Sequence, residues 1–256
     1  MQFNLPKTFM QKNNKKQKNF HVIYGRHAVK AVLDNQRRLI YKLFIDENID
    51  NAIEFDKNID VEYISKDRLF RMCKDGDKHQ GYIAHVSDLI EDLKLNDYID
   101  IFKKEEKASI VILDQINDPH NLGAILRSAR CFDIDLVIIT AYNMPQINSS
   151  VIRSSAGMSE YVNILTVTNI NQTIAQLKDS GFYTIGMECN TKSRNISDIV
   201  KENQKLAFVM GSEGSGMRPS IKESCNELVQ IKIHKDADSL NVSNAAAIMM
   251  YELFKK

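Results

Sequence analysis

From residue 108 onward the chain alternates short, continuously apolar runs with longer helical ones. The apolar runs predict strands at residues 109–113, 136–140, 161–167, 182–187, 206–210 and 228–233. A strand that is apolar along its whole length is buried on both faces, which is typical of a parallel sheet. We therefore expect an α/β fold with a mostly parallel sheet and helices on either side.

A smaller α/β unit is expected ahead of this sheet. Short β-rich runs predict strands at residues 21–24, 39–45, 61–64 and 82–86. The spacing of apolar residues predicts helices at residues 25–35, around Ile53 and Phe55, and at residues 66–73.

The chain is expected to divide into four parts. We predict a basic, flexible arm at residues 1–19, the small domain at residues 20–88 and the larger domain at residues 108–256. Residues 89–107 are rich in Asp, Glu and Lys, which suits a connecting helix or linker better than a core element. A length of 256 residues is enough for two modest domains with cores of their own.

The formal net charge of +1 is unevenly distributed along the chain. The arm has no acidic residue and contains five lysines: Lys7, Lys12, Lys15, Lys16 and Lys18. Lysines that meet phosphates release counterions, so the arm suits a polyanionic partner that its charge alone does not identify. From charge alone, a solvated tail that aids solubility is an equal alternative.

Several classes of protein are excluded by composition. No run approaches the ~18 to 20 consecutive apolar residues of a membrane helix, and lysines occupy the place of a signal peptide's apolar core. We expect a cytoplasmic protein with no membrane partner. The four cysteines lie far apart, without a C-x-x-C pair, so we expect reduced, buried thiols and no metal site.

Ligands of parallel sheets bind beyond the carboxyl ends of the strands, so the segments there are the candidate site. After the first strand of the larger domain, Asn121 is the predicted N-cap of an amphipathic helix. Arg127 and Arg130 share the polar face of that helix, and Gly123 removes side-chain bulk nearby. Arg127 suits a phosphate or a ribose, with an ordinary surface arginine as the alternative.

A glycine-rich loop, G-S-E-G-S-G-M-R-P, follows the predicted strand at residues 206–210. Its spacing fits neither a dinucleotide fingerprint nor a Walker loop nor a nucleophile elbow. We therefore predict a ligand loop lined by backbone, with one carboxylate, Glu213.

A third polar segment places Ser239, Asn241 and Ser243 just before a helix predicted at residues 244–254. Helix capping explains one of these side chains but not all three. They are candidate ligand contacts, with ordinary helix-start residues as the alternative.

Taken in order, these segments resemble the SpoU (TrmH) family of RNA ribose 2′-O-methyltransferases. The matching motifs are D-P-H-N-L-G-A-I-L-R-S-A at residues 118–129, G-S-E-G-S-G-M-R at 211–218 and S-L-N-V-S at 239–243. Y-G-R-H-A-V at 24–29 and H-Q-G at 79–81 resemble the start and end of the L30e-like substrate-binding domain of the family's rRNA branch. Three motifs in one order are a far stronger signal than any one of them.

The resemblance implies a SPOUT-type catalytic domain whose C-terminal chain is threaded into a trefoil knot. It also implies S-adenosyl-L-methionine as the cofactor, held bent among the knot loops by Gly211, Ile231 and Leu240. Family members act as homodimers, which makes a second copy of the chain an expected partner.

The resemblance further implies a methyl-acceptor site lined by catalytic residues on all three segments: Asn121, Arg127, Glu213, Ser239 and Asn241. In a homodimer, Arg127 is expected to reach the cofactor of the other subunit. The implied function is S-adenosylmethionine-dependent methylation of a ribose 2′-hydroxyl in RNA, with a guanosine of 23S rRNA as the favoured target. Two alternatives are a tRNA methyltransferase and a non-catalytic RNA-binding factor for ribosome assembly.

One departure from the family motif motivates the non-catalytic alternative. The family has I-P-M-x-G before S-L-N-V-S, whereas lysine replaces both the proline and the glycine here, at Lys232 and Lys235. If the glycine position requires a positive φ, Lys235 costs ~1 to 3 kcal/mol unless the loop has shifted. A cation near a sulfonium is also expected to weaken cofactor binding.

Overall fold

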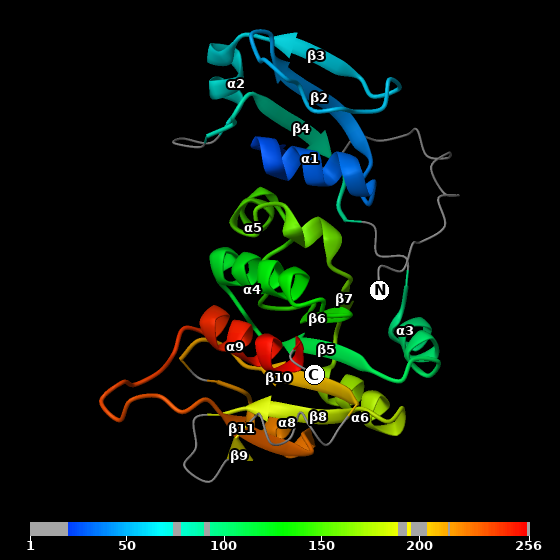
Figure 1. Cartoon of the computed structure of the whole chain (residues 1–256), viewed down its shortest axis with the longest axis vertical. Coiled ribbons are helices and arrows are strands. Elements are labelled where there is room, and N and C mark those ends of the chain that lie inside the picture. Colours follow the sequence, from blue (N-terminus) through cyan, green and yellow to red (C-terminus); the bar gives the residue numbers. More distant parts are fainter. Residues whose placement is uncertain are drawn as a thin grey trace.

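The computed structural model describes residues 20–73, 78–89, 93–188, 194–195, 204–214 and 216–254. These residues form two sheets, separated along the long axis of the molecule by a layer of helices (Figure 1). The arm predicted at residues 1–19 lies outside the described residues. No helix in the described ranges has the length and apolar character needed to span a bilayer.

The small sheet has the strand order β1-β4-β2-β3. Its strands are β1 (His21–Tyr24), β2 (Ile40–Asp46), β3 (Val61–Ile64) and β4 (Tyr82–Val86). One face packs on helix α1 (Arg26–Asn35) through residues such as Val29 and Val32, and the other packs on α2 (Lys66–Met72) through Leu69. These elements confirm the predicted strands and two of the three predicted helices.

The helix predicted around Ile53 and Phe55 is wrong, because this segment contains neither helix nor strand. Residues two apart lie on different sides of a helix, so the pair never described a helical face. Ile53 is instead buried in the core of the small domain, where its backbone N–H donates to the Tyr82 hydroxyl at 3.1 Å.

The large sheet has the strand order β7-β6-β5-β10-β8-β11-β9, and every recorded strand pair is parallel. Its strands are β5 (Ala108–Leu113), β6 (Leu136–Thr140), β7 (Ile164–Val167), β8 (Tyr183–Met187), β9 (Arg194–Asn195), β10 (Lys205–Met210) and β11 (Glu227–Gln230). The predicted parallel sheet is therefore confirmed. Two strands are shorter than predicted, because Tyr161 belongs to the 3₁₀ turn η1 (Met158–Tyr161) and the chain leaves the sheet after Gln230. The trefoil knot stays a prediction.

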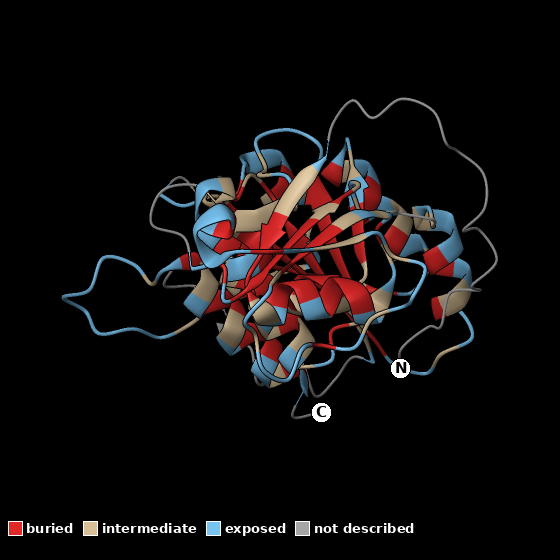
Figure 2. Ribbon diagram, turned by 90° about the horizontal axis from the view of Figure 1, so that it is seen from above, coloured by how far each residue is buried: buried red, intermediate tan, exposed pale blue. Residues whose placement is uncertain are grey.

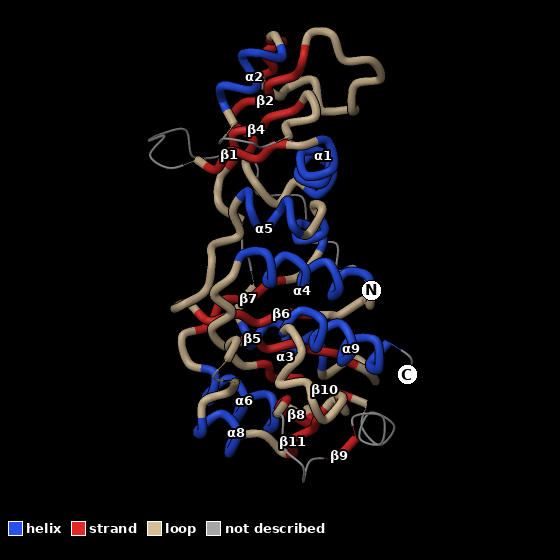
Figure 3. Tube along the Cα trace, turned by 90° about the vertical axis from the view of Figure 1, so that its left-hand side faces the viewer, coloured by secondary structure: helices blue, strands red, loops and turns tan. Residues whose placement is uncertain are grey.

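Helices cover both faces of the large sheet, as continuously apolar strands require (Figure 3). One face packs on α4 (Pro119–Cys131) and α9 (Val242–Phe254), and α5 (Ser149–Ser154) lies between α4 and the small sheet (Figure 1). The other packs on α3 (Leu95–Phe102), α6 (Ile170–Asp179) and α8 (Pro219–Ser224). Figure 2 shows the buried strands between these helices.

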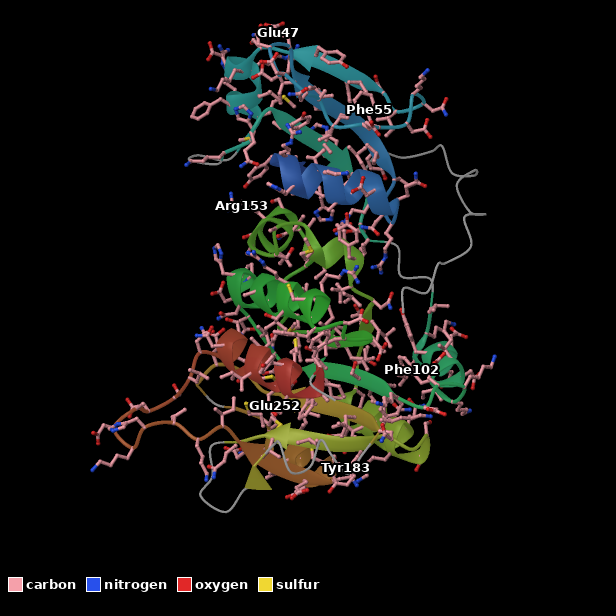
Figure 4. All side chains as sticks on the ribbon, viewed as in Figure 1. Glu47, Phe55, Phe102, Arg153, Tyr183 and Glu252 are labelled. Atoms are coloured by element: carbon pink, nitrogen blue, oxygen red, sulfur yellow. The ribbon has the colours of Figure 1, made fainter. Side chains whose placement is uncertain are left out.

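Helix α3 lies within the stretch that we expected to be a connection. It is a helix, but Tyr98 and Phe102 are buried against the large sheet, with Phe102 edge-on to Phe182 at 5.7 Å between ring centroids (Figure 4). Leu95, Tyr98, Ile99 and Phe102 follow the i, i+3, i+4, i+7 spacing of one helix face. The high charge of the surrounding residues concealed this apolar stripe, so the expectation that α3 lies outside the core was wrong.

The cysteines differ from the expectation of buried thiols. Cys131 is exposed at the end of α4, while Cys73 and Cys225 are partly exposed. Burial raises the pKa of the Cys225 thiol to about 11. Cys189 lies outside the described residues.

Candidate active site

The candidate site lies where two neighbouring strands of the large sheet end. β5 and β10 are parallel neighbours, and the backbone N–H of Asp114 donates to the Met210 carbonyl at 2.8 Å. β6 and β7 extend the sheet on one side of this pair, and β8, β11 and β9 extend it on the other. Such a switch point leaves a crevice between the loops that follow the two strands.

The loop after β5 enters α4 through Asp118, whose side chain accepts from the His120 backbone N–H at 2.8 Å. Pro119 occupies the first turn, where its missing N–H costs nothing. The prediction that Asn121 caps this helix was therefore wrong. Asn121 lies inside the first turn, 8% exposed, and its amide is available for contacts with other segments.

The loop after β10 folds tightly back on itself. The backbones of Ser212 and Gly216 pair in both directions, with N–O distances of 3.1 and 3.0 Å. A Cβ on Gly211 would lie 2.1 Å from the Gly216 carbonyl carbon, so no side chain fits there. Gly214 has a φ of 85°, which favours glycine. This turn carries Glu213 at its exposed end.

Three of the five predicted catalytic residues meet in one cluster. The Asn121 side-chain amide donates to Glu213 Oε1, and Asn241 Nδ2 donates to Asn121 Oδ1 at 3.1 Å. The contacts join segments 92 and 120 residues apart in the sequence. We call Asn121, Glu213 and Asn241 the polar cluster.

Asn241 is the residue of the third polar segment that caps helix α9. Its Oδ1 accepts from the Ser243 backbone N–H at 2.9 Å and from the Ser243 hydroxyl at 2.6 Å. One amide thus caps α9 with its oxygen and reaches Asn121 with its nitrogen. Ser243 serves this cap, which leaves Ser239 to be explained.

Ser239 and Arg127 do not join the polar cluster within the described residues. Ser239 is exposed on the segment before α9, and Arg127 is exposed on the outer face of α4. No recorded hydrogen bond or ion pair links either side chain to another described residue. Helix α4 therefore supplies Asn121 to the cluster, while Arg127 of the same helix is exposed to solvent.

The three residues predicted to hold a cofactor border the same region. Gly211 is buried at the end of β10, and Ile231 and Leu240 are half-buried against the core beneath α9. Residues 232–239 between them are all exposed, in a loop that stands away from the body of the protein (Figure 1, Figure 2).

Lys232 and Lys235 lie in this exposed loop and do not fill the space beside Gly211. Lys235 is not among the residues with a positive φ, so the lysine that replaces the motif glycine causes no backbone strain here.

Sequence reasoning missed one pair of residues that joins the two loops. Asp114 follows β5 with its side chain 2% exposed, and it accepts from Arg218 Nε at 3.0 Å and from Arg218 Nη2 at 2.9 Å. Arg218 precedes α8, directly after the glycine-rich loop. An acidic residue at the end of a fully apolar strand was the available signal, because a buried carboxylate requires a partner.

Among the described residues, no group of three or more His, Cys, Asp or Glu side chains is placed to bind a metal ion. The site consists of amides, one exposed carboxylate, a tight backbone turn and two apolar flanks. Such a site orients ligands through hydrogen bonds and shape.

Comparison with known proteins covers both parts of the chain. Residues 108–251 match the family described as "SpoU rRNA Methylase family", and residues 22–90 match "RNA 2'-O ribose methyltransferase substrate binding". The chain is 36% identical over 239 residues to a Coxiella burnetii protein named 23S rRNA (guanosine-2'-O-)-methyltransferase RlmB, covering 90% of this chain and 94% of that protein. It is 38% identical over 205 residues to a Borreliella burgdorferi protein named "Uncharacterized tRNA/rRNA methyltransferase", covering 77% and 88%.

Two solved structures share the fold. The SpoU methyltransferase AviRb from Streptomyces viridochromogenes, in complex with AdoMet, superposes with a TM-score of 0.75 at 18% identity, covering 92% of this chain and 89% of that chain. An AdoMet-bound rRNA methyltransferase from Sinorhizobium meliloti gives a TM-score of 0.74 at 19% identity, covering 92% and 87%.

Proposed function

The chain belongs to the SpoU family of S-adenosylmethionine-dependent RNA 2′-O-methyltransferases, and we propose that its substrate is a guanosine ribose of 23S rRNA. The observation that carries the proposal is the polar cluster, in which Asn121, Glu213 and Asn241 meet from three motifs at the switch point of the sheet. The choice of rRNA and guanosine is supported by the 36% identical relative named for that reaction. A cytoplasmic location belongs to the same proposal.

The residues around Gly211 fit S-adenosylmethionine. The tight turn after β10 offers backbone groups without side-chain bulk, and Ile231 and Leu240 offer half-exposed apolar surface suited to a flat ring. These three residues would hold the cofactor. When bound, its sulfonium supplies the activated methyl group, so the reaction needs no metal.

The chain's own residues then have two tasks, which are to orient the ribose and to manage one proton. Holding the 2′-oxygen in line with the methyl group contributes up to ~7 to 11 kcal/mol of the barrier. The amides of Asn121 and Asn241 are placed by each other and by Glu213, so they are oriented before RNA arrives. This pre-organisation is the main catalytic contribution that we assign to the cluster.

The proton is a separate problem. A guanidinium keeps its proton far above neutral pH, so using one as a base near neutral pH would cost more free energy than we can assume the site supplies. In this proposal, Arg127 binds the adjacent phosphate and stabilises the negative charge that develops on the 2′-oxygen. Ser239, Asn241 or a water molecule relays the proton.

The placement of Arg127 supports a homodimer. Arg127 is exposed and has no recorded hydrogen bond or ion pair with a described residue of its own polar cluster, and its helix packs against α9. On α9, Ile248, Tyr251 and Phe254 are 39%, 48% and 58% exposed. A second copy that covers this apolar face would bring Arg127 to the partner's acceptor site.

Mapping ribose methylation across rRNA from cells with and without this protein tests the proposal. The expected result is one 2′-O-methylguanosine in 23S rRNA that disappears with the protein. A filter assay with labelled S-adenosylmethionine and purified RNA provides the direct readout. Label incorporated only into tRNA would contradict the choice of substrate, and tight RNA binding without label would contradict the enzymatic role.

A further inference from the structure

The two domains are joined by an ion pair that is completely buried. Arg38 lies in the small domain between α1 and β2, and Glu160 lies in η1 of the large domain. Arg38 Nε donates to the two carboxylate oxygens of Glu160 at 3.1 and 3.0 Å, and both side chains are 0% exposed.

The rest of the Arg38 guanidinium binds two further segments. Nη1 donates to the Ser87 carbonyl at 3.0 Å, at the end of the small domain, and Nη2 donates to the Ile147 carbonyl at 2.9 Å, before α5. One side chain therefore joins two segments of the small domain to two segments of the large domain. A buried guanidinium whose Nε, Nη1 and Nη2 all donate hydrogen bonds has little freedom to adopt another geometry.

Close packing surrounds the ion pair at the interface of the two domains. Gly157 has a φ of 82°, and a Cβ there would lie 2.8 Å from the Ala31 Cβ on α1. Ile152 of α5 is 0% exposed within the core of the small domain. At the side of the same interface, Arg153 Nη1 donates to the Tyr24 hydroxyl at 2.8 Å (Figure 4).

Moving the small domain away from the large domain would cost free energy. If the small domain swung away, the buried pair would have to separate or be hydrated, and a buried charge without its partner costs several kcal/mol. A purely apolar interface could slide between packings, whereas a buried guanidinium that binds one carboxylate and two backbone carbonyls fixes the relative position of all three segments.

We propose that Arg38 and Glu160 are positioning residues that select the target nucleotide, by holding the RNA-binding domain at one distance and angle from the polar cluster. The proposal rests on the proposed function. An RNA bound at both places can then present only the nucleotide whose distance from the recognised element matches this fixed span. A swinging domain would let neighbouring riboses reach the cluster as well.

The test compares variants that break the pair with one that removes both charges. Arg38→Met and Glu160→Met each leave one buried charge alone, while the double variant Arg38→Met, Glu160→Met restores an uncharged interface and controls for folding. Arg38→Lys keeps the positive charge but loses the planar guanidinium, whose three nitrogen atoms bind three different residues. Lys30→Met, which removes an exposed ion pair with Asp34 on nearby α1, is the matched control.

The expected result separates RNA selection from catalysis. Both single variants and the folded double variant raise the KM for rRNA about tenfold and methylate neighbouring riboses, while calorimetry gives the same S-adenosylmethionine affinity within twofold. Arg38→Lys recovers part of the selectivity, and Lys30→Met behaves as wild type. A folded double variant with wild-type selectivity would overturn the proposal, because the pair would then be a structural contact only.

Small-angle X-ray scattering tests the same inference without any activity. The wild-type protein is expected to fit one rigid shape, and the Arg38→Met variant to require a range of domain orientations. Wild-type scattering that needs such a range overturns the proposal even if the enzyme methylates RNA. A wild-type protein that is rigid but transfers no methyl group overturns the proposed function instead.

Discussion

Arg218 and Asp114 fasten the two loops of the candidate active site to each other through a two-point ion pair. The carboxylate is buried at the end of β5, while the guanidinium is half-exposed at the end of the glycine-rich loop. The pair therefore determines where the turn that carries Glu213 lies relative to α4, which carries Asn121. It acts on the polar cluster without touching it.

Replacing Arg218 tests this relationship. Arg218→Ala leaves Asp114 buried without its partner, which we expect to lower the free energy of unfolding by about 1 to 3 kcal/mol. We also expect S-adenosylmethionine affinity to fall about tenfold, because the turn is no longer held. Urea unfolding and calorimetry measure the two effects. Arg68→Ala, which removes an exposed ion pair with Glu62, should change neither; unchanged affinity in Arg218→Ala would refute the positioning role.

Gly123 is the second position where a small change should have a large effect. A Cβ there would lie 1.9 Å from Ser154 Oγ and 2.8 Å from the Val151 carbonyl, so Gly123→Ala must push α4 away from α5. Overpacking of this kind costs about 1 to 3 kcal/mol of the free energy of unfolding. Removing the facing side chain in Gly123→Ala, Ser154→Gly should recover part of the loss in urea unfolding. No recovery would mean that the Val151 contact dominates.

Arg127 offers a test of the proposed homodimer. Arg127→Ala should abolish methylation with nearly unchanged cofactor affinity, since the role proposed for Arg127 is to bind the RNA phosphate and stabilise the developing alkoxide. Mixing Arg127→Ala with Asn121→Ala should restore activity, because a mixed dimer contains one site with both residues intact. If the mixture stays inactive although exchange of subunits is demonstrated, Arg127 acts within its own chain. Equal loss of methylation and cofactor binding would contradict its assigned role.

The lysine-rich arm should contribute to RNA affinity through phosphates. Deleting residues 1–19 removes five lysines, which is expected to weaken rRNA binding and to flatten the dependence of log Kd on log salt concentration. Filter binding between about 50 and 200 mM salt measures the slope. An unchanged slope would show that the arm does not meet the RNA backbone.

His79 predicts how the stability of the protein depends on pH. It is buried, its Nδ1 accepts from the Gly81 backbone N–H at 3.1 Å, and desolvation lowers the pKa of its imidazole below the usual 6.5. The unfolded chain therefore takes up this proton first, so the free energy of unfolding should fall as the pH drops below about 6.5 and stay flat above it. Desolvation lowers the pKa of His85 in the same direction.

Urea unfolding at pH 8, 7, 6 and 5.5 measures this dependence. His79→Gln should flatten part of the slope below about pH 6.5, and His85→Gln should flatten the rest. A slope that is identical in the wild type and in both variants would assign the acid sensitivity to other groups.

Local sequence determined most of the secondary structure, because apolar periodicity reports directly which side of a segment is buried. The runs at 136–140 and 206–210 required burial on both faces, and strands and a covered parallel sheet follow from that requirement alone. The same reasoning failed where the local signal was diluted. Charged neighbours concealed the apolar face of α3, and the cap of α4 was assigned to Asn121 although the helix begins three residues earlier, after Asp118.

Which segments meet was decided only by the tertiary structure. Asn121 contacts Glu213 across 92 residues because β10 lies beside β5, and no local sequence pattern specifies the strand order. The partners of Asp114 and Arg38 could not be predicted for the same reason. A buried charge requires an opposite charge nearby, but the local sequence does not indicate which residue supplies it. The sequence by itself thus determined the elements and the candidate residues, whereas the packing of two sheets against shared helices decided the geometry of the site.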